Sequence, residues 1–195
     1  MLQRRTYFIR EQVGIFKLKD TYDILAPETQ ELIGQATEAT PQWAVYLRLL
    51  LHKRHLPMSV VVRETPEAAP VLRIERGWSF MRSKVSVVDA QDVTIGYFKS
   101  KLFSFSGGFY VYNTEGVQVA EIKGSWKSWD FKFISDTGQE IGVVTKKWAG
   151  FGQELFTTAD NYLISINDMG AAQPASSILL LAAGLAIDTV FNEQQ

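Results

Sequence analysis

Basic residues recur in pairs on predicted strands in the middle of the chain. Arg82 and Lys84 are two residues apart, and so are Lys99 and Lys101. Residues i and i+2 of a strand share a face, so pairs on consecutive strands can form one basic surface, which favours phosphate groups. The sequence therefore predicts a site for anionic phospholipid headgroups, with the candidate residues Arg73, Arg76, Arg82, Lys84, Lys99 and Lys101. The alternative is a set of ordinary solvated strand charges, balanced by Glu75, Asp89 and Asp92.

A second group of basic and aromatic residues lies on a predicted helix near residues 41–54. The segment Thr40–Leu56 reads TPQWAVYLRLLLHKRHL, in which Thr40 can cap a helix and the following proline suits its first turn. Its apolar residues form one stripe, and its basic residues gather at the C-terminal end. The pattern suits a helix packed across the end of a barrel, or one that contacts a membrane interface. For the second case the candidate residues are Trp43, Leu47, Leu50, Lys53 and Arg54.

The chain shows no arrangement of residues that would support catalysis. His52 and His55 have no acidic residue nearby in sequence, and the carboxylates are spread through predicted turns. The absence of cysteine excludes thiol catalysis, disulfides and thiolate metal sites. We therefore expect no enzymatic activity and no cofactor. Aromatic residues alternate with basic ones between Trp78 and Phe133, but a barrel interior needs the same alternation, so nucleic acid is not an expected partner.

The elements that would position these residues are mostly strands. Short segments rich in β-branched and aromatic residues recur about every ten residues, separated by turn signals. Gly116 and Gly138 lie where tight hairpins need a positive φ. We expect about a dozen antiparallel strands in a single domain over residues 1–195, closed into a barrel that leaves no exposed edge.

The segment Pro174–Phe191 predicts one apolar C-terminal helix. From Ile178 to Ile187 no residue is charged, so this helix must be buried on all sides. A membrane span needs about 20 apolar residues, and this run of about ten ends at Asp188. We therefore predict a helix buried inside the domain rather than a transmembrane one. The N-terminus lacks the apolar core of a signal peptide, so we expect a cytoplasmic protein that can also associate peripherally with a membrane.

Two segments of the chain carry a recognisable motif. The first is Tyr22-Asp23-Ile24-Leu25, near the N-terminus. The second, in the C-terminal quarter, comprises Lys147, Trp148, Gly150, Phe156, Thr157, Ala159, Asp160, Asn161, Tyr162, Ile187 and Asp188. Together with the pattern of strands between them, these segments resemble the phospholipid scramblase family. The resemblance spans nearly the whole chain, and its specificity is concentrated in residues 146–191.

The resemblance implies a fold, and it also implies where a calcium site would lie. Like the related LURP-one and tubby C-terminal domains, the chain would form a closed barrel of about twelve antiparallel strands around a hydrophobic central helix. The family's proposed calcium loop has acidic residues at its first, third and twelfth positions. Here these positions hold Thr158, Asp160 and Met169, with Asp168 one place early. The motif is degraded, which leaves Asp160 and Asp168 as a weak calcium candidate.

These observations lead to one expected function and two alternatives. We expect a non-catalytic scramblase-like or tubby-like module that binds anionic phospholipid headgroups, or a protein partner, at a membrane surface. The first alternative is a phospholipid scramblase that moves lipids between bilayer leaflets. The second is a carrier whose barrel encloses an apolar ligand, although the terminal helix competes for that space.

Overall fold

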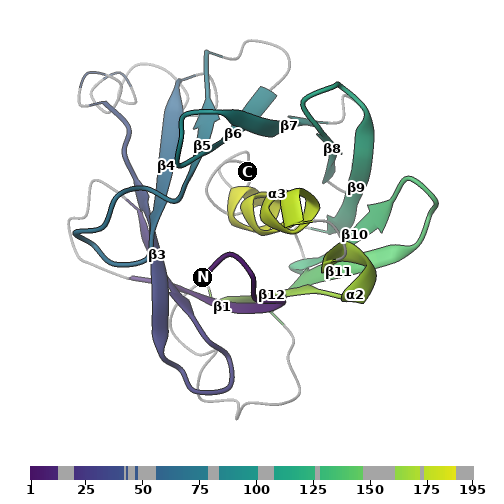
Figure 1. Cartoon of the computed structure of the whole chain (residues 1–195), viewed down its shortest axis with the longest axis horizontal. Helices are drawn as coiled ribbons and strands as arrows, with labels where there is room; N and C mark the ends of the chain where they lie inside the picture. Colours follow the sequence, from purple (N-terminus) through teal and green to yellow (C-terminus); the bar gives the residue numbers. More distant parts are fainter. Residues whose placement is uncertain are drawn as a thin grey trace.

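The computed structural model shows a closed barrel of twelve antiparallel strands around a central helix (Figure 1). It describes residues 1–12, 20–41, 43, 47, 56–78, 84–100, 108–125, 128–146, 161–171 and 174–187. The strands are β1 (Thr6–Glu11), β2 (Thr21–Leu25), β3 (Leu32–Glu38), β4 (Met58–Arg63), β5 (Leu72–Arg76), β6 (Lys84–Asp89), β7 (Thr94–Ser100), β8 (Gly108–Tyr112), β9 (Gln118–Ser125), β10 (Asp130–Ser135), β11 (Glu140–Thr145) and β12 (Tyr162–Ile166). The helices are α2 (Asp168–Ala171) and α3 (Pro174–Ala186).

Every strand pairs with its neighbours in sequence, and the first and last strands close the ring. β1 runs antiparallel to β12, with Tyr7 opposite Ile164. The expected barrel of about twelve antiparallel strands is confirmed. Closure pairs the backbone groups that an open sheet would leave at its edges.

The alternation of residue types along each strand separates the interior from the outer surface. On β10, Phe131 and Phe133 are buried in the core while Asp130 and Lys132 are exposed. Since side chains of a strand point alternately to its two faces, this pattern requires one face of β10 to point inward.

Helix α3 fills the barrel's interior, as the sequence predicts. Its residues from Leu179 to Ile187, apart from Gly184, belong to the same buried cluster as the inward-facing residues of the strands. Gly184 lies where an added Cβ would come within 2.6 Å of Cδ1 of Ile164 on β12. The predicted burial of the apolar helix inside the domain is confirmed.

In the part of the chain that the structure describes, neither helix combines the length and the hydropathy that a membrane span requires. The predicted helix at 41–54 falls largely outside the described residues. Of that segment beyond Pro41, only Trp43 and Leu47 are described, and both are helical.

The two ends of the barrel differ in their connections. At one end, called the turn end here, residues 26–31, 64–71, 90–93, 113–117 and 136–139 join the strands, and α2 follows β12. At the opposite end, called the loop end, the strands are joined by residues 12–20, 39–57, 77–83, 101–107, 126–129 and 146–161, most of which lie outside the described residues.

Candidate functional site

Two lysines lie side by side on the outer face of the barrel, near its loop end. Lys84 on β6 is directly opposite Lys99 on β7 in the strand register. The Lys84 ammonium lies 4.4 Å from the ring centroid of Tyr97, and the Lys99 ammonium lies 5.2 Å from the same ring. Lys99 is also 5.0 Å from the ring of Tyr112 on β8. Lys84, Tyr97, Lys99 and Tyr112 are called the lysine–tyrosine patch below.

The local sequence explains why these side chains face outward together. On β7, Gly96 and Phe98 are buried, so the period of two directs Tyr97 and Lys99 to the outer face. Phe98 packs on Phe109 of β8 with ring centroids 5.5 Å apart, which fixes β7 against β8 from inside. On the outside the rings of Tyr97 and Tyr112 stack at 5.1 Å with an interplanar angle of 13°.

The charge of the lysine–tyrosine patch is not neutralised by the described residues. Neither Lys84 nor Lys99 forms an ion pair with any of them, whereas Lys123 and Lys132, on β9 and β10, each contact a glutamate. The hydrogen bond from Lys132 to Glu140 raises the pKa of that lysine. Two adjacent ammonium groups repel each other, and the tyrosine ring faces offset part of this repulsion. The patch therefore presents two adjacent positive charges on the outer face of the barrel that no described carboxylate pairs with.

The structure separates the other predicted headgroup residues from this pair. Arg73 faces outward on β5, but it contacts Glu75 at 3.1 Å and also Asp92, and these hydrogen bonds raise its pKa. Arg76 is buried, and its Nη2 donates a hydrogen bond to the carbonyl oxygen of Leu56 at 3.3 Å. Of the predicted set, only Lys84 and Lys99 are brought together among the described residues. Arg82 and Lys101 lie outside them.

The prediction from sequence did not include the tyrosines. Tyr97 could have been found, because it shares a strand face with Lys99 two residues later. Tyr112 could not, because only the pairing of β7 with β8 places it opposite Tyr97.

The candidate membrane-interface residues are only partly described. Trp43 stacks on Trp78, which follows β5, with ring centroids 5.9 Å apart, and each is 49% exposed. Trp78 therefore does not belong to the interior, unlike Phe131 and Phe133 in the same aromatic series. Leu47 is half-buried. Leu50, Lys53 and Arg54 lie outside the described residues.

Of the two residues of the weak calcium candidate, only Asp168 is described. Asp168 begins α2 and forms an ion pair with Arg5. Asp160 lies outside the described residues. Among the residues that are described, no three acidic or histidine side chains group as metal ligands would.

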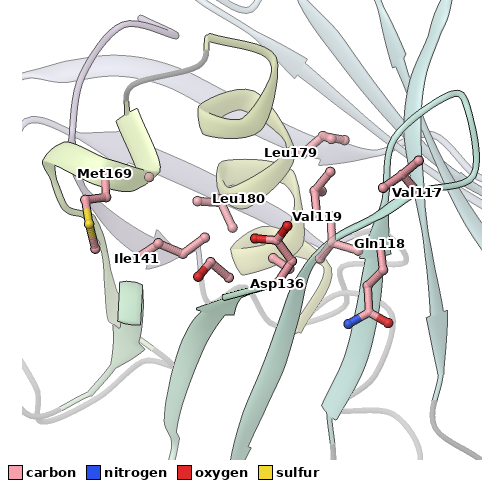
Figure 2. Close-up of a pocket in the computed structure, with 12 residues that line it drawn as sticks. Val117, Gln118, Val119, Asp136, Ile141, Met169, Leu179 and Leu180 are labelled. Atoms are coloured by element: carbon pink, nitrogen blue, oxygen red, sulfur yellow. The ribbon is translucent and has the colours of Figure 1, made fainter. Parts of the chain in front are cut away.

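A separate cavity of about 220 Å³ opens at the turn end (Figure 2). Leu179 and Leu180 of α3 and Ile141 of β11 supply apolar lining, and Asp136 contributes a carboxylate. The two lysines of the lysine–tyrosine patch lie towards the loop end, because Lys84 begins β6 and Lys99 lies near the end of β7. Tyr112 of the patch, in contrast, ends β8 beside the turn 113–117, whose Val117 lines the cavity.

Comparison with known proteins gives one match. The model of the Scramblase family matches residues 9–194 of this chain. No curated protein and no solved structure matches it. The resemblance predicted from the sequence, over nearly the whole chain, is thus confirmed. Since the match spans nearly the whole chain, the protein belongs to the Scramblase family.

Proposed function

We propose that the protein binds anionic phospholipid headgroups at a membrane surface through the lysine–tyrosine patch. The observation that carries this proposal is the pair Lys84 and Lys99, which lie opposite each other over tyrosine rings without an ion pair among the described residues. Membership of the Scramblase family supports a lipid as the ligand.

The chemistry of the patch suits the headgroup region of a bilayer. Ammonium groups donate charge-assisted hydrogen bonds to phosphate oxygens, and tyrosine presents an apolar ring with a polar tip, as interfacial residues do. Each lysine near an anionic bilayer contributes about 1 kcal/mol of binding free energy at physiological salt. The pair should therefore contribute about 2 kcal/mol, which corresponds to roughly a 30-fold difference in affinity.

Flotation with lipid vesicles tests the proposal. The wild-type protein should float with phosphatidylcholine vesicles that contain phosphatidylserine, and not with pure phosphatidylcholine vesicles. Raising the salt concentration should release it, because the attraction falls off within a Debye length. The double variant Lys84→Gln/Lys99→Gln should lose about 30-fold in partition coefficient.

Arg73→Gln is the matched control for this experiment. Arg73 also faces outward, but Glu75 and Asp92 already pair with its guanidinium. Its removal should leave the partition coefficient nearly unchanged. The proposal fails if the lysine variant and the arginine control behave alike, or if phosphatidylserine does not increase flotation.

Movement of lipids between leaflets is a second candidate function, favoured by the family to which the chain belongs. Its test is the loss of fluorescence from labelled lipid when dithionite is added to vesicles that contain the protein. Bleaching beyond the outer leaflet at a low ratio of protein to lipid would favour this function over headgroup binding alone.

A further inference from the structure

The turn end of the barrel is acidic. The N-terminal residues 1–5, the turns at this end and α2 carry eight carboxylate side chains and only two basic ones, Arg4 and Arg5. Several carboxylates are already paired, among them Asp168 with Arg5 and Glu64 with the N-terminal amine. The carboxylates at this end that form no ion pair with described residues are Glu31, Glu67, Glu115 and Asp136.

One of these unpaired carboxylates, Asp136, lines the cavity at the same end. A second, Glu115, lies two residues before the lining residue Val117 in the turn 113–117. Figure 2 shows Met169 of α2 and Val117 on opposite sides of the cavity, with Leu180 between them. Val117 is 53% exposed and Met169 is 49% exposed, although both side chains are apolar. The cavity therefore combines an apolar floor, an apolar mouth and a rim that carries the Asp136 carboxylate.

The volume limits what the cavity can hold. Sites that enclose a whole small molecule typically measure about 300–1,000 Å³. At about 220 Å³ the cavity suits one apolar side chain better than a complete lipid or cofactor. The acidic rim disfavours an anionic headgroup and favours a cationic neighbour of that side chain.

We propose that the turn-end cavity binds a basic segment of a protein partner, by taking up one leucine-sized side chain while flanking lysines or arginines contact Asp136 and Glu115. A buried apolar anchor surrounded by charged pairs is a common arrangement in protein interfaces. This proposal does not depend on headgroup binding, because neither Lys84 nor Lys99 lines the cavity.

Fluorescence anisotropy with a labelled peptide tests this site. The probe is a nine-residue peptide with one central leucine flanked by lysines and serines. Two matched peptides replace the leucine by serine, or all the lysines by glutamate. Only the first peptide should bind appreciably, and its affinity should fall as salt increases. If the serine peptide binds as tightly as the leucine peptide, the cavity does not take up the leucine side chain. If the glutamate peptide binds as tightly, the carboxylates do not contribute to binding.

Variants of the mouth locate the binding. The double variant Val117→Ser/Met169→Ser should lower the affinity for the leucine peptide at least tenfold. Both side chains are half exposed, so the fold should survive these changes. Val93→Ser is the matched control, because Val93 is 56% exposed in a turn at the same end and does not line the cavity. Equal effects of the double variant and this control would refute the site.

Charge variants test the rim in the same way. Asp136→Asn/Glu115→Gln should remove most of the salt dependence, while Glu31→Gln, across the barrel end, should not.

Sedimentation of the free protein checks a different occupant. Association that grows with concentration and disappears in Val117→Ser/Met169→Ser would mean that a second copy fills the cavity, which overturns the proposal. Flotation should be unchanged in the mouth variant, so failure here is distinguishable from failure of headgroup binding.

Discussion

The packing of α3 inside the barrel makes the effect of Gly184→Ala depend on one neighbouring side chain. At an exposed position in a helix, replacing glycine by alanine stabilises the fold by about 1 kcal/mol. Here the new Cβ would lie 2.6 Å from Cδ1 and 2.9 Å from Cγ1 of Ile164. Carbon atoms pack best at about 3.5–4.0 Å, so both contacts overlap. Overpacking of this kind costs about 1–3 kcal/mol, which cancels or exceeds the gain in helix propensity.

Shortening Ile164 should therefore rescue the glycine variant. Ile164→Val removes Cδ1, the atom in the closest contact, and by itself should cost about 0.5–1.5 kcal/mol. In the double variant the gain in helix propensity can be realised, so it should be about 1 kcal/mol more stable than the sum of the single effects predicts. The relief of the steric overlap is only partial, because Cγ1 and Cγ2 of residue 164 remain close to the added Cβ.

Urea unfolding followed by tryptophan fluorescence measures this coupling through the midpoint and the m-value. Ile74→Val is the control, since Ile74 is also buried but lies on β5, and the three atoms nearest to a Cβ at Gly184 all belong to Ile164. Its combination with Gly184→Ala should be additive within about 0.5 kcal/mol. A Gly184→Ala variant more stable than wild type by about 1 kcal/mol would refute the packing of α3 against β12.

Three further predictions concern other contacts. Burial alone would raise the pKa of Asp23, but hydrogen bonds from Arg10 and two glutamines outweigh burial and lower the pKa below its ordinary value of 3.8. The stability that results is therefore present above pH 3.8 and is lost as the pH falls through the native pKa of Asp23. Acid titration of unfolding should show a smaller loss of stability for Asp23→Asn than for wild type. Burial raises the pKa of Tyr7 from 10.0 to about 12, so the native state loses stability as the pH rises from 10 towards 12. In alkaline unfolding experiments, Tyr7→Phe should reduce this fall of the unfolding free energy with pH. Leu181→Ala should destabilise the fold by about 2–5 kcal/mol in urea unfolding, because this side chain is fully buried in the core, and a loss below 1 kcal/mol would contradict that burial.

The sequence predicted the barrel because the signals for strands and hairpins are local. Phe131 and Phe133 alternate with Asp130 and Lys132, and that alternation survives in the structure as an inner and an outer face. The alternation fails on β1, where Tyr7, Phe8 and Ile9 are all buried. Phe8 faces outward and packs with Leu25 and Leu163, a cluster that needs β1 to lie between β2 and β12.

The candidate headgroup site was predicted less completely, because a charged residue does not reveal its partner in sequence. Arg73 and Lys99 are alike as cations on strands, yet Asp92, from a distant turn, pairs with the first and not with the second. Arg76 has the same residue type as Arg73 three positions earlier, but this odd spacing directs it to the inner face, where it is buried. The odd spacing between Arg73 and Arg76 would have placed these two residues on opposite faces of the strand.

Closure between β1 and β12 has a consequence for how the chain folds during its synthesis. β1 leaves the ribosome first, yet one of its two partner strands is the last to be made. Hairpins can form one after another as the chain emerges, because every other pair is adjacent in sequence. Until β12 and α3 follow, the growing sheet has an open edge on β1 and no helix against its apolar face. Contacts of such long sequence separation slow folding, and exposed edges and apolar faces in the meantime favour aggregation. We therefore expect nascent chains that end before β12 to be the species that depends most on chaperones.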